Sequence, residues 1–203
     1  MKLAVSQELF AYWNRLRGER VAPERNDIDP AALRAVLADV FILEYDAGKG
    51  FPLRISGSRS NALFLRELRN TSFLDCWAGE FHQEIAAILR QVADEAQPMI
   101  LGAKARADTQ ASLEFEILAL PLRYFGDTHA RILGAIAPRA APPWLGLLPM
   151  QNLNLTSLRA LDRRSGAASL YNAIPNAQQR LFGGARNIVR RGHLYVHSAK
   201  REI

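Results

Sequence analysis

Two strands joined by a tight turn stand in residues 112–137, SLEFEILALPLRYFGDTHARILGAIA, and this stretch decides the fold. Apolar and polar residues alternate as far as Ile117, which predicts a strand with one buried face. The alternation breaks at Leu118, which indicates either a bulge or a strand that is covered on both faces. The turn FGDT (125–128) leads into a second strand over 129–137, so we expect the two strands to pair antiparallel.

Outward from this hairpin, the same patterns predict three more strands and the helices around them. Strands are expected over 40–45, 51–56 and 100–108. Apolar spacing predicts helices over 6–17, from Asp29 to Val40 and over 80–96, with short helical turns over 57–79. This order predicts an α+β fold: a five-stranded antiparallel sheet with helices on one face, plus N-terminal helices and a basic C-terminal tail.

A series of short motifs follows the chain between residues 9 and 137, and none of them is specific on its own. They are FAYW (10–13), RG (17–18), APERNDIDP (22–30), DVFIL (39–43), RISGSR (54–59), REL (66–68), SFLD (72–75) before Trp77, LPLR (120–123) and ARILGA (130–135). In this order and spacing they resemble a bacterial family built as a single PAS domain with an N-terminal helical extension. The resemblance implies a PAS-type sensory or protein-interaction module in bacterial signal transduction. It carries no catalytic residues to transfer, so we expect a protein that is not an enzyme.

The sequence departs from the pattern of that family at two positions. The family leads us to expect glycine just before Arg66 and again near Asn70, where this chain has Leu65 and Asn70. Glycine would allow unusual backbone angles or a close approach of the backbone. These positions therefore bear on the shape of the short-helix segment, which lines the pocket in ligand-binding PAS domains.

The predicted elements divide the chain into four parts. Residues 1–38 form the N-terminal helical extension, 39–138 the PAS-like core, 139–162 an apolar segment and 163–203 a basic tail. The segment 139–162 is too apolar for a free linker, so we expect it to pack on the domain or on a second subunit. Disorder is the expectation for the tail, although residues 193–197 could form a strand with a partner.

Pocket residues are predicted on the short-helix segment, the long helix and the facing strand. The candidates for ligand binding are Phe64, Leu68, Phe73, Trp77, Phe81, His82, Ile85 and Phe115. PAS haem sensors carry a haem-ligating histidine on the equivalent helix, but a lone His82 is also explained as an exposed residue of a first helical turn. Cys76 invites a flavin-adduct interpretation, yet its surroundings differ from those of light sensors, and a buried cysteine is the simpler explanation. The cofactor is therefore unknown, with none expected, and haem or flavin as alternatives.

Interaction surfaces are predicted at both ends of the core. Tyr12, Trp13 and Leu16 share one face of the first helix, and PAS domains often dimerise through N-terminal helices, so a homodimer is expected. Trp144 is the second candidate contact. Six charged residues are expected on one sheet face, either as solvated cross-strand pairs or as a polar docking surface: Arg54, Lys104, Arg106, Glu114, Glu116 and Arg131.

Charge is concentrated in the tail. Residues 163–203 contain eight Lys or Arg and one Glu, a net +7, which leaves 18 basic and 19 acidic residues, a net −1, in the first 162. The alternative function is therefore binding of nucleic acid or another anionic surface through the tail. His193 and His197 stand four apart, but no third ligand completes a metal site.

Composition excludes several classes of protein. There is no apolar run long enough for a transmembrane helix, and no phosphate-binding loop or Gly-x-Ser-x-Gly motif. Residues 1–10 lack an apolar h-region, so a signal peptide is not expected. A single cysteine, Cys76, fits a cytoplasmic location, where thiols stay reduced. The expected partners are a signalling protein and possible small-molecule ligands.

Overall fold

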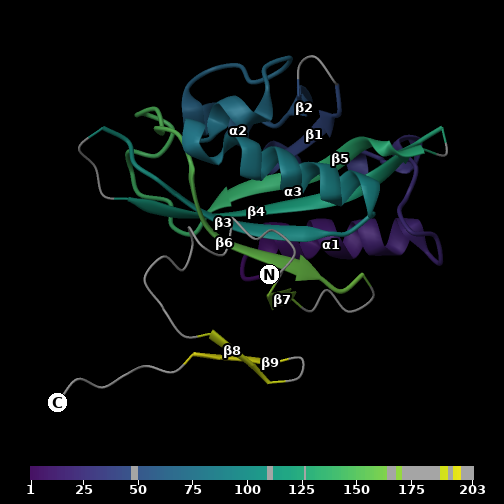
Figure 1. Ribbon diagram of the computed structural model, residues 1–203. Helices are drawn as coiled ribbons and strands as arrows, with labels where there is room; N and C mark the ends of the chain where they lie inside the picture. Colours follow the sequence, from purple (N-terminus) through teal and green to yellow (C-terminus); the bar gives the residue numbers. More distant parts are fainter. Residues whose placement is uncertain are drawn as a thin grey trace. The chain divides into compact units, whose positions relative to one another are not determined.

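One antiparallel sheet organises the first of two units, Met1–Tyr171, in the computed structural model (Figure 1). The structure describes residues 1–46, 50–108, 112–125, 127–163, 168–170, 188–191 and 194–197. The strands of the sheet follow the order β2-β1-β5-β4-β3-β6-β7, and every neighbouring pair is antiparallel. Their bounds are β1 Val40–Glu44, β2 Leu53–Ser56, β3 Met99–Ala105, β4 Leu113–Tyr124, β5 Asp127–Pro138, β6 Asn154–Leu161 and β7 Ala168–Leu170.

The α+β class and the PAS-like sheet are confirmed, but the sheet has seven strands where five were expected. Strand β6 pairs with β3 along its whole length and leads into β7. The register shifts between Gly102 and Ala103, where β6 carries one extra residue, Thr156. Such a bulge interrupts the alternation of apolar and polar residues, which is why the sequence pattern did not reveal β6.

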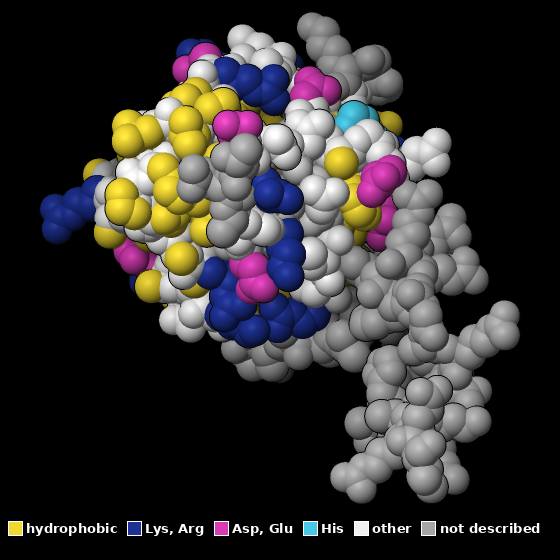
Figure 2. Space-filling view, turned by 90° about the vertical axis from the view of Figure 1, so that its left-hand side faces the viewer, with side chains coloured by type: hydrophobic (Ala, Val, Ile, Leu, Met, Phe, Trp, Pro, Cys, Tyr) yellow, Lys and Arg dark blue, Asp and Glu magenta, His cyan; other side chains and the backbone are white. Residues whose placement is uncertain are grey.

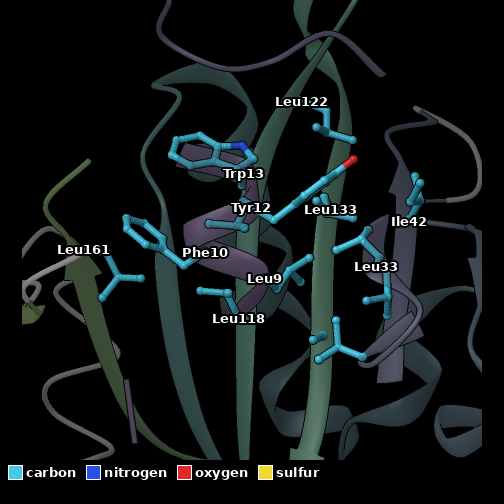
Figure 3. Close-up of a cluster of buried hydrophobic side chains, with 14 of the residues drawn as sticks. Leu9, Phe10, Tyr12, Trp13, Leu33, Ile42, Leu118, Leu122, Leu133 and Leu161 are labelled. Carbon is cyan, nitrogen blue, oxygen red and sulfur yellow. The ribbon is translucent and has the colours of Figure 1, made fainter. Parts of the chain in front are cut away.

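Helix α1, Ala4–Arg17, covers one face of the sheet (Figures 1 and 3). Its apolar side packs on β4, β5 and β1, and the cluster includes Leu9, Phe10, Tyr12, Trp13, Leu33, Ile42, Leu118, Leu122, Leu133 and Leu161. The carboxylate of Glu116, on β4, accepts hydrogen bonds from the backbone N–H groups of Lys2 (2.9 Å) and Leu3 (3.0 Å). A carboxylate at the N-terminus of a helix is electrostatically favourable, so Glu116 fixes the start of α1 on the sheet.

The opposite face of the sheet carries α2, Ser58–Phe64, and α3, His82–Asp94. The buried side of α3 contains Ile85, Ile88, Leu89 and Val92. Between the helices lie the 3₁₀ turns η4, Phe73–Cys76, and η5, Gly79–Phe81. Because helices cover both faces, β4 is buried on both, which accounts for the broken alternation at Leu118.

The helix expected from Asp29 to Val40 is wrong as a continuous helix. The structure has two 3₁₀ turns there, η2 (Ala31–Leu33) and η3 (Leu37–Asp39), after a third turn η1 (Arg25–Asp27). The N-cap of η2 is Pro30 rather than Asp29, although Oδ1 of Asp29 accepts a hydrogen bond from the backbone N–H of Ala31 at 2.9 Å. Leu33 and Val36 are buried against the sheet all the same, whereas Leu37, which the spacing placed on the same helical face, is 38% exposed.

Leu65 and Asn70 occupy left-handed backbone conformations, with φ of 47° and 65°. These are the two positions where glycine was expected. The backbone therefore keeps the conformation that glycine would favour, although such angles are strained for leucine.

The second unit, Asn172–Ile203, contains a two-stranded antiparallel hairpin, β8 (Ile188–Arg191) and β9 (Leu194–His197). Of the strand suggested over residues 193–197 for pairing with a partner, Leu194–His197 pair with β8 of the same chain. Most of the basic tail, and with it His193, lies outside the described residues. The predicted boundary at residue 162 stays a prediction, and β7 lies beyond it.

Candidate functional site

The space between the sheet and α3 is where a PAS ligand pocket was expected. The candidates Phe64, Leu68, Phe73, Trp77, Phe81, Ile85 and Phe115 are all buried there, none more than 9% exposed. Three aromatic rings form a row of contacts. The centroids of Phe41 and Phe73 lie 4.9 Å apart, and Phe73 contacts Trp77 edge to face at 6.1 Å. These contacts fill the middle of this face with the chain's own side chains.

Gly134 explains how the Phe41 ring reaches its place. A Cβ on Gly134 would lie 2.2 Å from Cζ of Phe41 and 2.6 Å from the carbonyl oxygen of Leu118. Glycine is needed because the ring rests directly on the β5 backbone. The indole Nε1 of Trp77 is buried and has no hydrogen-bond partner, so it is a donor that a water molecule or a small polar ligand could satisfy.

His82 does not fit the role of a haem ligand. Its Nε2 lies 3.0 Å from the carbonyl oxygen of Trp77, in hydrogen-bonding contact, and the ring is half-buried at the start of α3. The nitrogen that would approach an iron is thus occupied by the backbone. The neighbouring interior is occupied by Phe73 and Trp77, which leaves the side chains of this region packed against one another rather than around a porphyrin.

Cys76 is 1% exposed, and burial raises the pKa of its thiol to about 11, although the nearby Arg66 charge opposes the shift. The reactive form of cysteine is the thiolate, which is scarce at neutral pH under these conditions. Cys76 therefore does not fit a nucleophile, and its packing agrees with a small buried hydrophobe.

Tyr12 and Trp13 are not available to a second subunit in this arrangement. Trp13 is fully buried and Tyr12 is 4% exposed. The indole Nε1 of Trp13 donates to the carbonyl oxygen of Pro121 at 2.8 Å. The expected dimer face of the first helix is covered by the chain's own sheet, and only Leu16 of the three is half-exposed.

The segment around Trp144 packs on α2 and forms an apolar groove. The backbone N–H of Met150 donates to the carbonyl oxygen of Leu63 at 2.8 Å, which ties the segment down. A cavity of about 160 Å³ opens there, lined by Asp39, Arg59, Ala62, Leu63, Pro138, Leu145 and Gly146. Trp144 itself is half-buried, and Leu147 stands out with 72% of its surface exposed.

Asp39 and Arg59 form the charged end of this groove. Arg59 donates through Nε (2.9 Å) and an Nη (2.7 Å) to the two oxygens of Asp39, and this carboxylate raises the pKa of the Arg59 guanidinium. The Asp39 side chain is 5% exposed, while that of Arg59 is 59% exposed. Gly57 permits the contact, because a Cβ there would lie 2.2 Å from the carbonyl oxygen of Ala38.

Sequence reasoning did not nominate Asp39, Gly57 or Arg59 as functional residues. All three stand in the motifs DVFIL and RISGSR on which the family resemblance rests. Their place in these two motifs was the only signal in the sequence, and it does not show that Asp39 and Arg59 form one contact.

The charged residues of the sheet form ion pairs on the face that α1 covers. Glu44 pairs with Arg54 and, at 3.6 Å, with Arg131, whose guanidinium also lies 4.1 Å from the Tyr124 ring centre. Glu114 pairs with Arg139 and, at 3.5 Å, with Lys104. The hydrogen bond from Arg139, followed by its charge, lowers the pKa of Glu114.

Figure 2 shows hydrophobic side chains gathered on one part of the surface and Lys and Arg side chains gathered beside them.

Within the described ranges, no group of three or more His, Cys, Asp or Glu could hold a metal ion. In the same residues, no helix is both long and apolar enough to cross a membrane.

The comparison with protein families identifies the class of protein. A family model described as PAS domain matches residues 1–137, and the chain belongs to this family. PAS domains serve as sensory or interaction modules. No curated protein matches the chain.

Proposed function

We propose that the chain is a non-catalytic PAS module of bacterial signal transduction that acts in the cytoplasm by binding a partner protein at its surface. The observation that carries this proposal is the contrast between the filled interior and the groove beside Trp144. Phe41, Phe73 and Trp77 occupy the region between sheet and helices, whereas the groove is apolar and open.

The size of the groove favours a side chain over a free ligand. Pockets for drug-sized molecules have volumes of roughly 300–1,000 Å³, and this one has about 160 Å³. A single apolar side chain of a partner fits such a space. Arg59 binds Asp39 through Nε and one Nη and is 59% exposed at the rim, so its other Nη favours a partner with an acceptor, such as a carboxylate, next to that apolar residue.

A photocrosslinking amino acid at position 147 tests this proposal in cells. Leu147 is 72% exposed beside the groove, and Phe125, 84% exposed before the start of β5, is the matched control position. We expect one discrete crosslinked protein from position 147, none of the same mass from position 125, and a several-fold weaker product in the Arg59→Gln variant. Identical products from both positions, or no product, would count against the groove as the docking site.

A crosslink between two copies of the chain would contradict a separate partner at the groove. It would support the homodimer expected from the family resemblance, now through Leu147 rather than through Tyr12 and Trp13. The mass of the product, twice that of the chain or not, decides between the two.

A further inference from the structure

A second hollow lies on the sheet face that α1 only partly covers. It has a volume of about 200 Å³, and its lining includes Lys2, Lys104, Glu114, Glu116, Arg139, Thr156, Ser157 and Arg159 around Gly102. Gly102 pairs with Glu116 on β4 and with Ser157 on β6, so it stands at the centre of the three strands. The groove beside Trp144 shares none of these residues.

The floor of the hollow is built by a glycine and a bulge. A Cβ on Gly102 would lie 2.4 Å from Oγ of Ser157 and 3.1 Å from Oγ1 of Thr156. Successive side chains of a regular strand point to opposite faces. The register shift at this point instead brings the hydroxyl groups of two consecutive residues, Thr156 and Ser157, to the same face of the sheet. Bulges are known to redirect side chains in this way.

Several donors around the hollow have no protein partner: Lys2 and Thr156 are exposed, and Ser157 and Arg159 are half-buried. Within the described part of the chain, the structure gives no hydrogen bond or ion pair to the side chains of Lys2, Thr156, Ser157 or Arg159. The Nε of Arg159 is moreover buried without a partner. A buried guanidinium nitrogen with no acceptor is unfavourable, so an acceptor supplied from outside the chain would be stabilising here.

The acids of the hollow already have partners of their own. Glu116 accepts from the backbone N–H groups of Lys2 and Leu3, and Glu114 pairs with Arg139 and Lys104. Four basic and two acidic residues line the space, which leaves a net charge of +2. The unpaired donors therefore face an environment that favours an anion.

We propose that this hollow binds a phosphate group, held by the Arg159 guanidinium, the Lys2 ammonium and the hydroxyl groups of Thr156 and Ser157. Guanidinium, ammonium and hydroxyl donors together suit the several acceptor oxygens of a phosphate. The small volume fits the phosphate itself, either as the free ion or as the phosphoryl end of a small phosphomonoester.

Calorimetric titration of the full chain with inorganic phosphate and with ribose 5-phosphate tests the proposal, at a constant ionic strength set with chloride. Arg159→Ala should weaken binding of both probes at least tenfold. Arg90→Ala, which removes the same charge from an exposed position on α3, should change it less than twofold. Glu114→Gln should tighten binding, because it removes a negative charge from the rim while Arg139 and Lys104 remain.

The two probes distinguish the source of the phosphate. Equal affinities indicate a site for the free ion, and tighter binding of ribose 5-phosphate indicates a phosphomonoester. Gly102→Ala, which fills the floor and turns the Ser157 hydroxyl away, should abolish binding of both probes with little change in thermal unfolding. No binding by the parent chain, or equal losses in Arg159→Ala and Arg90→Ala, would overturn the proposal.

Discussion

Gly134 and Gly102 stand on opposite faces of the same sheet, and their surroundings differ. At Gly134 the missing side chain is replaced by the Phe41 ring, and the β4 backbone closes the other side. At Gly102 the nearest atoms are the hydroxyl oxygens of Ser157 and Thr156, at the bottom of a polar hollow. One glycine is used to pack the interior, and the other leaves room for something that is not part of the chain.

The comparison shows why the pocket expected from the family is not the most open part of this molecule. The face under α2 and α3 is filled by aromatic and aliphatic side chains. The face under α1 is apolar where the helix lies and polar next to the start of the helix, at Lys2 and Glu116. Substitutions on the face under α2 and α3 should therefore lower the stability of the fold. Substitutions in the polar hollow on the other face should weaken ligand binding and leave stability nearly unchanged.

The largest effect on stability is expected from Gly134→Ala. The new methyl group would overlap the Phe41 ring and the Leu118 carbonyl, and neither can move without disturbing the packing. Overpacking of this kind costs about 2–3 kcal/mol of unfolding free energy. Urea unfolding measures it, and a loss below about 0.5 kcal/mol would show that the ring does not rest on the strand as described.

The second-largest loss of stability is expected from Trp13→Phe. We expect it to lower the free energy of unfolding by about 2 kcal/mol, because it removes the hydrogen bond to Pro121 and leaves a smaller ring. Trp144→Phe is the matched control, because Trp144 is only half-buried, and it should lose less than about 0.5 kcal/mol. Equal losses in the two variants would contradict the different burial of these tryptophans. Thermal unfolding of both proteins under the same conditions gives the comparison.

Leu65→Gly should be stabilising, by about 0.5–1 kcal/mol. Left-handed φ costs leucine roughly 1–2 kcal/mol, and the entropy of glycine offsets only part of the relief. The side chain is 48% exposed and so contributes little packing. Asn70→Gly should change stability by no more than a few tenths of a kcal/mol, since asparagine tolerates this conformation. A loss of stability in Leu65→Gly would contradict the assigned strain.

Gly102→Ala should have the smallest effect on stability, within about 0.5 kcal/mol of the parent chain. The Ser157 hydroxyl can rotate away from the new methyl group, and alanine loses less backbone entropy than glycine in a strand. Urea unfolding of Gly102→Ala and Gly134→Ala under the same conditions compares the unfolding free energies lost on the two faces. Equal losses at the two glycines would remove the distinction between a packed face and an open one.

Much of the fold could be predicted from the sequence. The strands at 40–45, 51–56, 100–108, 112–123 and 129–137 match β1 to β5 closely, because their apolar alternation or β-branched composition is strong. The break at Leu118 was interpreted as a bulge or a strand covered on both faces, and burial supports the second. Strand β6 was missed because its bulge at Thr156 disrupts the alternation that identifies a strand.

The sites were harder to predict, because they depend on contacts between distant parts of the chain. Asp39 and Arg59 meet only because Gly57 brings α2 against η3. Arg159 and Lys2 line the same hollow from opposite ends of the first unit. The pattern that placed Tyr12 and Trp13 on one face of α1 was correct, but it could not distinguish a face buried by the chain's own sheet from a face buried by a second subunit.

Native mass spectrometry of the full chain, combined with its absorbance spectrum, tests most directly whether the interior is filled by the chain itself. We predict the mass of the chain or a whole multiple of it, with no addition other than one that the Arg159→Ala variant loses, and no haem or flavin band. A discrete added mass that the Arg159→Ala variant also retains, or a cofactor band in the spectrum, would contradict the account. Such a result would place a ligand among Phe73, Trp77 and His82 instead of a partner at the surface.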